Sequence, residues 1–276
     1  MTHHDDNHTP EQAESPFAFA AAEQQLDTLS LVQCAVEGKR AVLAYQPVVQ
    51  ASRTDRVAFY EGLIRLLDDT GRIIPAHEFM EAIEDKEIGR CVDCIALELG
   101  LRALADEPDL RLSINMSARS IGYRRWTQTL EQGLDMDETI AERLILEITE
   151  SSAMQMPELV TTFMGDLQAR GISFALDNFG AGFTAFRYFK EFFFDIVKID
   201  GQFIRGIAKD PDNQVLTKAL RSIAGHFEMF TVAECVENQQ DITFLQSIGI
   251  DCFQGYFFGA PSVRPPWKRE LAANWS

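Results

Sequence analysis

The chain has 276 residues, of which 46% are hydrophobic and 24% are charged, and its formal net charge is -17. This composition is typical of a globular domain with a large core. The negative charge opposes binding to nucleic-acid polymers and to anionic membranes. No apolar run has the length of a membrane span, and the polar, acidic N-terminus is unlike a signal peptide. We therefore expect a cytoplasmic protein that binds neither a nucleic-acid polymer nor a membrane.

The N-terminal end and the cysteines carry little chemistry. Residues 1–20 have the composition of a disordered tail, and the three histidines in it (His3, His4 and His8) indicate chance or a cloning remnant rather than a metal site. Five cysteines form no disulfide framework in a chain of this kind. Cys91 and Cys94 have the CxxC spacing but lie in a helical pattern, which favours small apolar packing residues over metal or redox chemistry.

Strands and helices alternate along the rest of the chain. A helix is expected over residues 21–38, with its apolar stripe ending at a glycine. After it, β-branched apolar runs predict eight strands at residues 42–49, 57–67, 110–116, 144–148, 173–176, 196–199, 231–233 and 252–257. Stretches of helical period lie between most of them, at residues 78–104, 121–134, 157–170, 213–227 and 239–248.

This alternation is typical of a parallel sheet with crossover helices. Eight strands over this length predict a (β/α)8 barrel of the TIM type, an α/β fold, as a single domain over residues 21–276 with an N-terminal helical extension. An open, doubly wound sheet is the structural alternative. It usually carries a glycine-rich phosphate loop after its first strand, and this sequence has none.

Polar side chains occur within or just after seven of the predicted strands: Glu61, Asn115, Glu147, Asp177 with Asn178, Lys198, Glu234 and Gln254. Taken singly, each has an ordinary interpretation as a cap, a turn residue or a snorkelling side chain. In a parallel barrel, however, the carboxyl ends of the strands converge on one mouth, where enzymes of this fold build their sites. Seven consecutive strands that each carry such a residue therefore favour a shared functional site.

The donor chemistry of this set also points in one direction. Glu61, Asn115, Glu147, Asp177 and Glu234 all offer oxygen ligands, and none of the set offers a thiolate or an imidazole. Such ligands favour Mg²⁺, Mn²⁺ or Ca²⁺ over zinc. With Lys198 nearby, the set suits stabilisation of a phosphoryl oxyanion and of a hydroxide on the metal.

The motifs around these residues occur in a recognisable order: Ala44-Tyr-Gln-Pro-Val-Val, Tyr60-Glu-Gly-Leu-Ile-Arg65, Ile114-Asn-Met-Ser, Leu146-Glu-Ile-Thr-Glu-Ser, Asp177-Asn-Phe-Gly-Ala-Gly, Val197-Lys-Ile-Asp, Ala233-Glu-Cys-Val-Glu and Gln254-Gly-Tyr-Phe-Phe. Over residues 30–262 the chain resembles the EAL domain family, phosphodiesterases that linearise cyclic di-GMP to pGpG. Glu61-Gly62-Leu63 stands where the family has its name tripeptide, with glycine in place of alanine.

The resemblance implies a role for each matching residue. It implies two Mg²⁺ or Mn²⁺ ions, held by Glu61, Asn115, Glu147, Asp177, Asn178 and Glu234. It implies that Lys198 contacts the attacking water and that Lys198, Glu61 and Glu234 form the catalytic centre. It implies substrate contacts from Gln46, Arg65, Gln254 and Asp200. Glu150 matches a glutamate that supports the loop after Asp177, a loop that couples dimerisation to activity in relatives; a homodimer is expected on this analogy.

Some positions depart from the family pattern. Asn178 stands where relatives have a second aspartate that binds the second metal, and a neutral carbonyl oxygen should weaken that site. Cys235 replaces a glycine beside Glu234, and residues 183–187 differ from the family's usual run. We expect a slow or metal-sensitive phosphodiesterase. The alternatives are a receptor that binds intact cyclic di-GMP and acts through a protein partner, and a barrel kept only for protein contacts.

Overall fold

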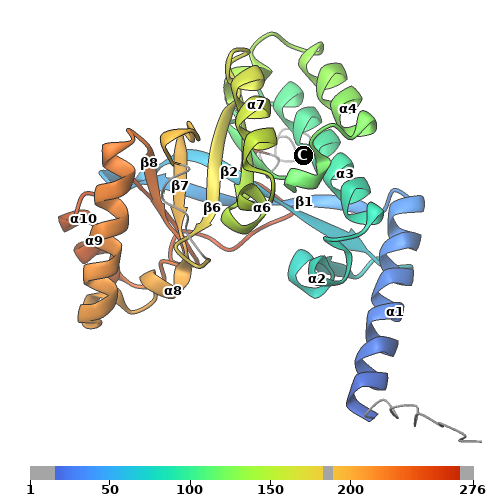
Figure 1. Ribbon diagram of the computed structural model, residues 1–276, viewed down its shortest axis with the longest axis horizontal. Coiled ribbons are helices and arrows are strands. Elements are labelled where there is room, and N and C mark those ends of the chain that lie inside the picture. The colour runs from blue at the N-terminus through green and yellow to red at the C-terminus, as the bar shows by residue number, and fades with distance from the viewer. Residues whose placement is uncertain (1–15, 183–188, 268–276) are drawn as a thin grey trace, which may run out of the picture.

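The computed structural model of the chain describes residues 16–182 and 189–267, with side chains described from residue 25 onward. Nine strands form one sheet, and eight of them close into a barrel (Figure 1). The strands are β1 (Ala41–Gln50), β2 (Arg53–Leu67), β3 (Ile73–Pro75), β4 (Leu112–Asn115), β5 (Leu144–Thr149), β6 (Ser173–Phe179), β7 (Ile196–Ile199), β8 (Phe230–Ala233) and β9 (Cys252–Gln254). All eight predicted strands are present, and the barrel prediction is confirmed.

One strand of the barrel runs against the others, which corrects the expectation of a wholly parallel sheet. Strand β1 pairs antiparallel with β2 on one side and with β9 on the other. Only residues 51 and 52 separate β1 from β2. A connection of two residues can join antiparallel strands only, because parallel neighbours need a long crossover. The remaining barrel pairs, from β2 and β4 round to β9, are parallel.

The barrel interior is built in two layers. Its apolar layer takes one residue from each of six strands: Val48, Phe59, Ile145, Ala175, Ile196 and Val232. Side chains two residues apart on a strand share a face. The residues two positions further along β2, β5, β6, β7 and β8 are Glu61, Glu147, Asp177, Lys198 and Glu234. The polar groups therefore lie directly above an apolar floor, toward the carboxyl ends of the parallel strands.

Helices cover the outside of the barrel and pack on a second, larger apolar core. They are α2 (Met80–Ile83), α3 (Glu87–Asp106), α4 (Arg124–Leu134), α5 (Ile140–Arg143), α6 (Glu150–Gln155), α7 (Pro157–Gln168), α8 (Gly201–Ile204), α9 (Pro211–His226) and α10 (Gln239–Ser247), with short 3-10 turns at Ala76–Glu78, Ala118–Ser120 and Ile207–Lys209. The helix expected over residues 78–104 is in fact two, α2 and α3, because a turn interrupts it. Gly89 permits that turn, since a Cβ there would lie 2.6 Å from the carbonyl oxygen of Ile83.

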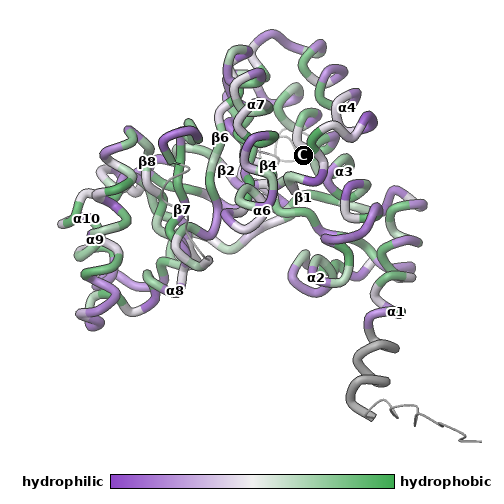
Figure 2. Tube along the Cα trace, in the orientation of Figure 1, coloured by the Kyte–Doolittle hydropathy of each residue, from purple (hydrophilic) through white to green (hydrophobic). Residues whose placement is uncertain are grey.

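The N-terminal helix α1 (Pro16–Glu37) extends away from the barrel (Figure 1). It starts five residues before the expected position, so residues 16–20, assigned to the tail, are helical, and residues 1–15 lie outside the described residues. Figure 2 shows the apolar and polar stretches along the trace. Near the C-terminal end of α1, Val32 and Ala35 pack in a separate small core with Leu66, Ile74, Phe79, Ile83 and Val92. This core joins α1 to β2, β3, α2 and α3.

Within the described part of the chain, no helix combines the length and apolar character needed to cross a lipid bilayer.

The cysteines of the CxxC pair differ in environment. Cys94 is buried, whereas Cys91 is half-buried with its Sγ 3.9 Å from the hydroxyl of Tyr123. Cys94 therefore packs as a small apolar residue, as predicted, whereas Cys91 is only partly buried.

Candidate active site

A buried lysine lies among four carboxylates inside the barrel. The Nζ of Lys198 on β7 is 2.8 Å from Glu147 Oε2, 3.0 Å from Glu61 Oε2, 3.1 Å from Glu234 Oε1 and 3.6 Å from Asp177 Oδ1. Its side chain is 1% exposed. Four of the five charged side chains lie on four strands and Glu234 directly follows β8, and each was selected from the sequence. The structure brings this part of the predicted set together at one point.

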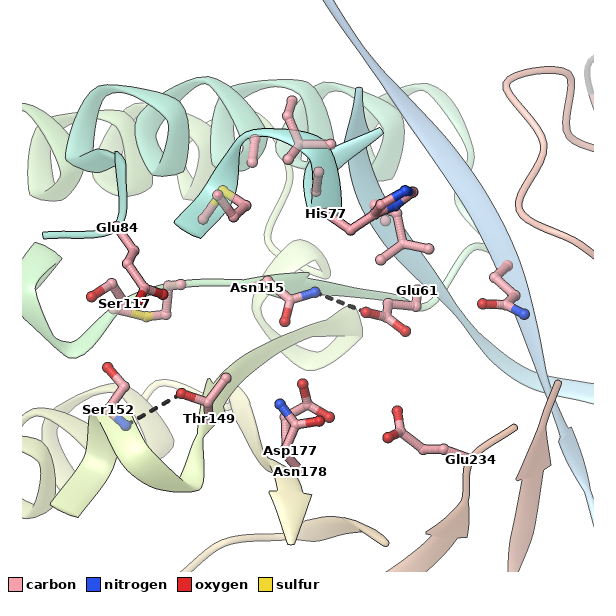
Figure 3. Close-up of a pocket in the computed structure, with 18 of the residues that line it drawn as sticks. Glu61, His77, Glu84, Asn115, Ser117, Thr149, Ser152, Asp177, Asn178 and Glu234 are labelled. Carbon is pink, nitrogen blue, oxygen red and sulfur yellow. Dashed lines mark hydrogen bonds between the residues drawn. The ribbon is translucent and has the colours of Figure 1, made fainter. Parts of the chain in front are cut away.

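Two amide side chains complete the surroundings of Glu61. Asn115 at the end of β4 donates from Nδ2 to Glu61 Oε1 at 2.8 Å (Figure 3). Gln254 on β9 donates to the other oxygen, Oε2, at 2.5 Å. Gln254 also donates to Gln46 Oε1 at 3.1 Å, and Gln46 in turn donates to the carbonyl of Gly259. Gln46 and Gln254 are therefore fixed relative to the carboxylate cluster by a chain of hydrogen bonds.

Burial and the charges within the cluster shift the pKa values of its ionisable groups. Burial raises the pKa of Glu147 and that of Glu234 to about 8 each, although the positive charge of Lys198 opposes the rise in both. Burial also opposes ionisation of Glu61, but the charge of Lys198 and the hydrogen bonds from Gln254 and Asn115 outweigh it and lower the pKa of Glu61. The surrounding carboxylates raise the pKa of Lys198 well above its ordinary value despite its burial. Four carboxyl groups therefore share one ammonium group, and burial favours the protonated form of Glu147 and Glu234.

The cluster forms the base of a cavity of about 720 Å³. The cavity is lined by most of the predicted site residues, namely Gln46, Glu61, Arg65, Asn115, Asp177, Asn178, Glu234 and Gln254. Lys198 and Glu147 are not in the lining, because they lie beneath it with exposed fractions of 1% and 0%. The volume is within the range of sites that enclose a small organic ligand.

Asp177 and Asn178 reach the cavity together because of a β-bulge. The pairing of β6 with β7 shifts register between Leu176 and Phe179. Asn178 has a φ of 56°, in the left-handed region that asparagine tolerates better than most residues. Successive side chains in a regular strand point to opposite faces, whereas both of these line the cavity (Figure 3). The bulge thus aims two neighbouring oxygen donors at one site.

Asp200 is the one predicted substrate-binding residue that the structure does not place in the cavity lining. Its Oδ1 accepts a hydrogen bond from the backbone N–H of Gln202 at 2.7 Å and caps the N-terminus of α8. Its carboxylate therefore serves as a helix cap. Glu150, predicted to support the loop, is buried, and its Oε2 accepts a hydrogen bond from the N–H of Gly180 at 3.0 Å. Residues 183–188 of that loop lie outside the described residues.

Other cavity residues were missed from the sequence. The cavity wall includes His77, Asp93, Ser117, Arg119 and Arg205. His77 and Arg119 follow no apolar strand end, so the pattern used to select candidates passes over them. Asp93 carried a usable signal, because it is an acidic residue on the apolar face of an otherwise amphipathic helix.

The site chemistry fits a divalent cation, although the side chains are not arranged around one. Among residues 16–182 and 189–267, no group of three acidic, histidine or cysteine side chains stands at metal-binding geometry. Lys198 Nζ lies between the carboxylates instead. Glu147 Oε1 and Asp177 Oδ1 are nevertheless buried without a hydrogen-bond partner. Buried oxygens that lack a hydrogen bond and carboxylate and amide donors are what a divalent cation would satisfy.

Fold and site together define a TIM-type barrel with a lysine-centred acidic site at its strand ends. The sequence model of the family described as EAL domain matches residues 30–261. The chain belongs to the EAL domain family. Its glycine at position 62 packs tightly, since a Cβ there would lie 2.7 Å from Ile114 Cδ1.

Individual relatives agree with this assignment. The chain is 32% identical over 235 residues to the cyclic di-GMP phosphodiesterase PdeB of Shewanella oneidensis, covering 82% of this chain and 27% of that protein. It is 29% identical to the cyclic di-GMP phosphodiesterase PdeF of Escherichia coli, covering 84% of this chain and 31% of that protein. The chain thus spans about a quarter to a third of the length of these curated relatives.

Solved structures have the same fold. The PaMucR phosphodiesterase in complex with c-di-GMP is 26% identical, with a TM-score of 0.75 over 88% of this chain and 99% of that one. The FimX EAL domain from Pseudomonas aeruginosa bound to c-di-GMP has a TM-score of 0.78 at 24% identity, covering 86% of this chain and 97% of that one. The second likeness supports the fold alone.

Proposed function

We propose that this domain hydrolyses cyclic di-GMP to linear pGpG in the presence of Mg²⁺ or Mn²⁺. The observation that carries the proposal is the position of Lys198, whose ammonium group lies within 3.1 Å of three carboxylates beneath a cavity of about 720 Å³. Relatives named as cyclic di-GMP phosphodiesterases support the choice of substrate.

The residues that would hold the cations follow from the cluster. Glu61, Asn115, Glu147 and Asp177 would hold one ion, and Asp177, Asn178 and Glu234 would hold a second, weaker one. Bound divalent ions supply positive charge that acidifies water and stabilises the developing oxyanion. The unpartnered Glu147 Oε1 and Asp177 Oδ1 support the first site.

The chain's own groups position and protonate the reacting atoms. The raised pKa of Lys198 keeps its ammonium protonated, so this group donates hydrogen bonds and does not act as a base. It would hold the attacking water beside Glu61 and Glu234. Glu234 would accept one proton as the water oxygen bonds to phosphorus. The bond from phosphorus to O3′ then breaks, and the proton taken up by Glu234 passes to O3′, which leaves a 3′-hydroxyl on pGpG with the phosphate retained at the 5′ position.

Arg65 and the two glutamines would bind the substrate. Arg65 is half-buried on β2, lines the cavity and donates one hydrogen bond from its NH1 to the carbonyl of Ile64 at 2.9 Å. Its guanidinium retains further donors for a phosphate, and Arg is well suited to phosphate oxygens. Gln46 and Gln254 also line the cavity and present amide groups held by hydrogen bonds.

The second candidate is a receptor that binds cyclic di-GMP without cleaving it and acts through a protein partner. Two observations favour it: the neutral Asn178 at the bulge, and the absence of a preformed metal group among the described residues. For either function we propose that a single domain over residues 21–276 operates in the cytoplasm as a homodimer.

Purified protein incubated with cyclic di-GMP and either Mn²⁺ or Mg²⁺, followed by chromatography of the nucleotides, separates these functions. Accumulation of pGpG that requires the metal supports the phosphodiesterase. Calorimetric binding of cyclic di-GMP without any product supports the receptor. Neither binding nor product would leave a barrel that serves only protein contacts.

A further inference from the structure

A buried carboxylate outside the cluster holds the chain segment that follows Asn115. Asp93 lies on α3 and is 6% exposed. Its Oδ2 accepts hydrogen bonds from the backbone N–H of Ser117 at 3.0 Å and from Ser120 Oγ at 2.6 Å. Ser120 itself is fully buried. Both partners belong to the turn that begins two residues after Asn115.

Three consecutive backbone amides of this segment are anchored in three different elements. Met116 N donates to the carbonyl of Glu147 on β5 at 2.9 Å, Ser117 N to Asp93 on α3, and Ala118 N to Ser152 Oγ on α6 at 2.8 Å. The first anchor is the ordinary continuation of the sheet. The second is the only one of the three made by an ionisable side chain.

Burying a carboxylate at position 93 lowers the stability of the fold unless hydrogen bonds compensate for its lost hydration. Among the ion pairs of residues 16–182 and 189–267, none involves Asp93, so its charge is stabilised only by the hydrogen bonds from Ser117 and Ser120. Burial raises the pKa of Asp93 to about 6. Packing alone would be served better by an apolar residue at this point of α3. The retained polar group therefore points to a positional role.

The side chain that Asp93 would position is that of Asn115. It is the last residue of β4 and donates to Glu61 Oε1 (Figure 3). Immediately after it the chain leaves the sheet, so the direction of its side chain depends on where the next residues are held. Asp93 fixes those residues from the opposite side of the turn.

We propose that Asp93 is a positioning residue that sets the orientation of Asn115 and thereby the divalent-cation affinity of the acidic cluster. This inference rests on the proposed function, because it deepens the assignment of Asn115 as a ligand. Asp93 is part of the cavity wall but is not among the carboxylates that contact Lys198. It acts through the backbone of Ser117 and the hydroxyl of Ser120.

Three variants of the full chain test this proposal. Asp93→Leu removes the acceptor, Asp93→Asn keeps an acceptor oxygen of nearly the same shape, and Ser120→Ala removes one partner only. Leu104→Ala is the matched control, because Leu104 is fully buried on the same helix and does not line the cavity. Mn²⁺ affinity is measured by calorimetry without nucleotide, and kcat and KM are measured where turnover is present.

We expect Asp93→Leu to lose about 10-fold in Mn²⁺ affinity, in the range seen when groups that orient metal ligands are removed. Ser120→Ala should lose less, and the effects of Asp93→Leu and Ser120→Ala should not add in the double variant, because both remove one interaction. Asp93→Asn should restore Mn²⁺ affinity to within about threefold of the wild type. Leu104→Ala should unfold more easily without changing Mn²⁺ affinity.

Wild-type Mn²⁺ affinity in folded Asp93→Leu would overturn the proposal, as would an equal loss in Leu104→Ala. If Asp93→Leu fails to fold, the comparison of Ser120→Ala with Leu104→Ala decides. Failure of the proposed function has a different signature, since the wild type would then give no pGpG while the Mn²⁺ affinities of the variants still differ as stated. A wild type that binds no Mn²⁺ would overturn both.

Discussion

Asp177 and Asn178 are consecutive in the chain, yet both line the same cavity. The register shift between β6 and β7 and the φ of 56° at Asn178 make this possible. The bulge therefore presents one charged and one neutral oxygen donor to the site. This pair is the point at which the chain departs most clearly from a fully acidic cluster.

Asn178→Asp should strengthen the second cation site. A carboxylate in place of the amide adds one negative charge at a position that already faces the cavity, and aspartate also tolerates the left-handed region. We expect Mg²⁺ affinity or turnover to rise by about 10-fold or more. Calorimetry and initial rates at several Mg²⁺ concentrations measure the two quantities. No change in either would show that this position does not contact the cation.

Cys235 and Gly201 form a tight contact behind Glu234. Cys235 has a φ of 54°, which disfavours residues other than glycine, and a Cβ on Gly201 would lie 2.5 Å from Cys235 Sγ. Gly201→Ala should therefore lower the free energy of unfolding, by about 1–3 kcal/mol for overpacking. Cys235→Gly should relieve the strained backbone, worth about 1 kcal/mol.

Urea unfolding of both single variants and of the double variant measures this contact. Gly201→Ala should cost much less in the Cys235→Gly background, because the clashing sulfur is gone. Equal costs in the two backgrounds would mean that the sulfur is not what excludes a side chain from position 201. Cys235→Gly also removes the contact of the Cys235 sulfur with Arg205, so about 1 kcal/mol is an upper value for its gain in the free energy of unfolding.

Asp93 should make stability depend on pH. Its pKa in the folded protein is about 6, against an ordinary value of 3.8. Between these values the folded state binds more protons than the unfolded state, so the contribution of this group to stability falls as pH rises and is constant above pH 6. The total fall is about 3 kcal/mol at most, because one pKa unit corresponds to about 1.4 kcal/mol.

Asp93→Asn removes this titration and keeps the hydrogen-bond acceptor. The free energy of unfolding of the variant, minus that of the wild type, should therefore rise across that pH window. Measuring the difference cancels the titration of the other carboxylates. A difference that stays constant with pH would show that Asp93 ionises in the folded protein as it does in water.

Ca²⁺ should inhibit turnover in the presence of Mg²⁺ or Mn²⁺. Ca²⁺ binds the same oxygen donors but accepts larger and less regular coordination, so it occupies the site without the compact geometry that an activated water requires. Initial rates at fixed Mn²⁺ and increasing Ca²⁺ provide the measurement. Full activity with Ca²⁺ as the sole divalent ion would contradict the expectation.

Much of the fold could be predicted because its strands read clearly in the sequence. Each is an apolar run, and in β5, β6, β7 and β8 the polar site residue comes two positions after the inward apolar residue. That spacing follows from the alternation of faces along a strand, so Glu147, Asp177, Lys198 and Glu234 were identifiable before the structure. The antiparallel direction of β1 was also readable, because the predicted gap of residues 50–56 is too short for a parallel crossover.

Other features depend on contacts that no local pattern contains. The break between α2 and α3 depends on the approach of Ile83 to Gly89, and the local role of Asp200 depends on where α8 begins. The cavity wall around His77 and Arg119 comes from connecting segments whose direction tertiary packing sets. Distances between strands, such as those from Lys198 to its four carboxylates, follow from closure of the barrel and could not be predicted from the sequence.

The most direct test of the account is a comparison of wild type with Lys198→Met for the conversion of cyclic di-GMP to pGpG in saturating Mn²⁺. Methionine has a similar length and lacks the ammonium group, so the carboxylates remain while the buried positive charge is lost. We predict that the wild type forms pGpG and that Lys198→Met, still folded by circular dichroism, loses at least about 100-fold in kcat, within the range typical of a lost hydrogen-bond donor that stabilises the transition state. Wild-type turnover in folded Lys198→Met would contradict the central role given to this lysine.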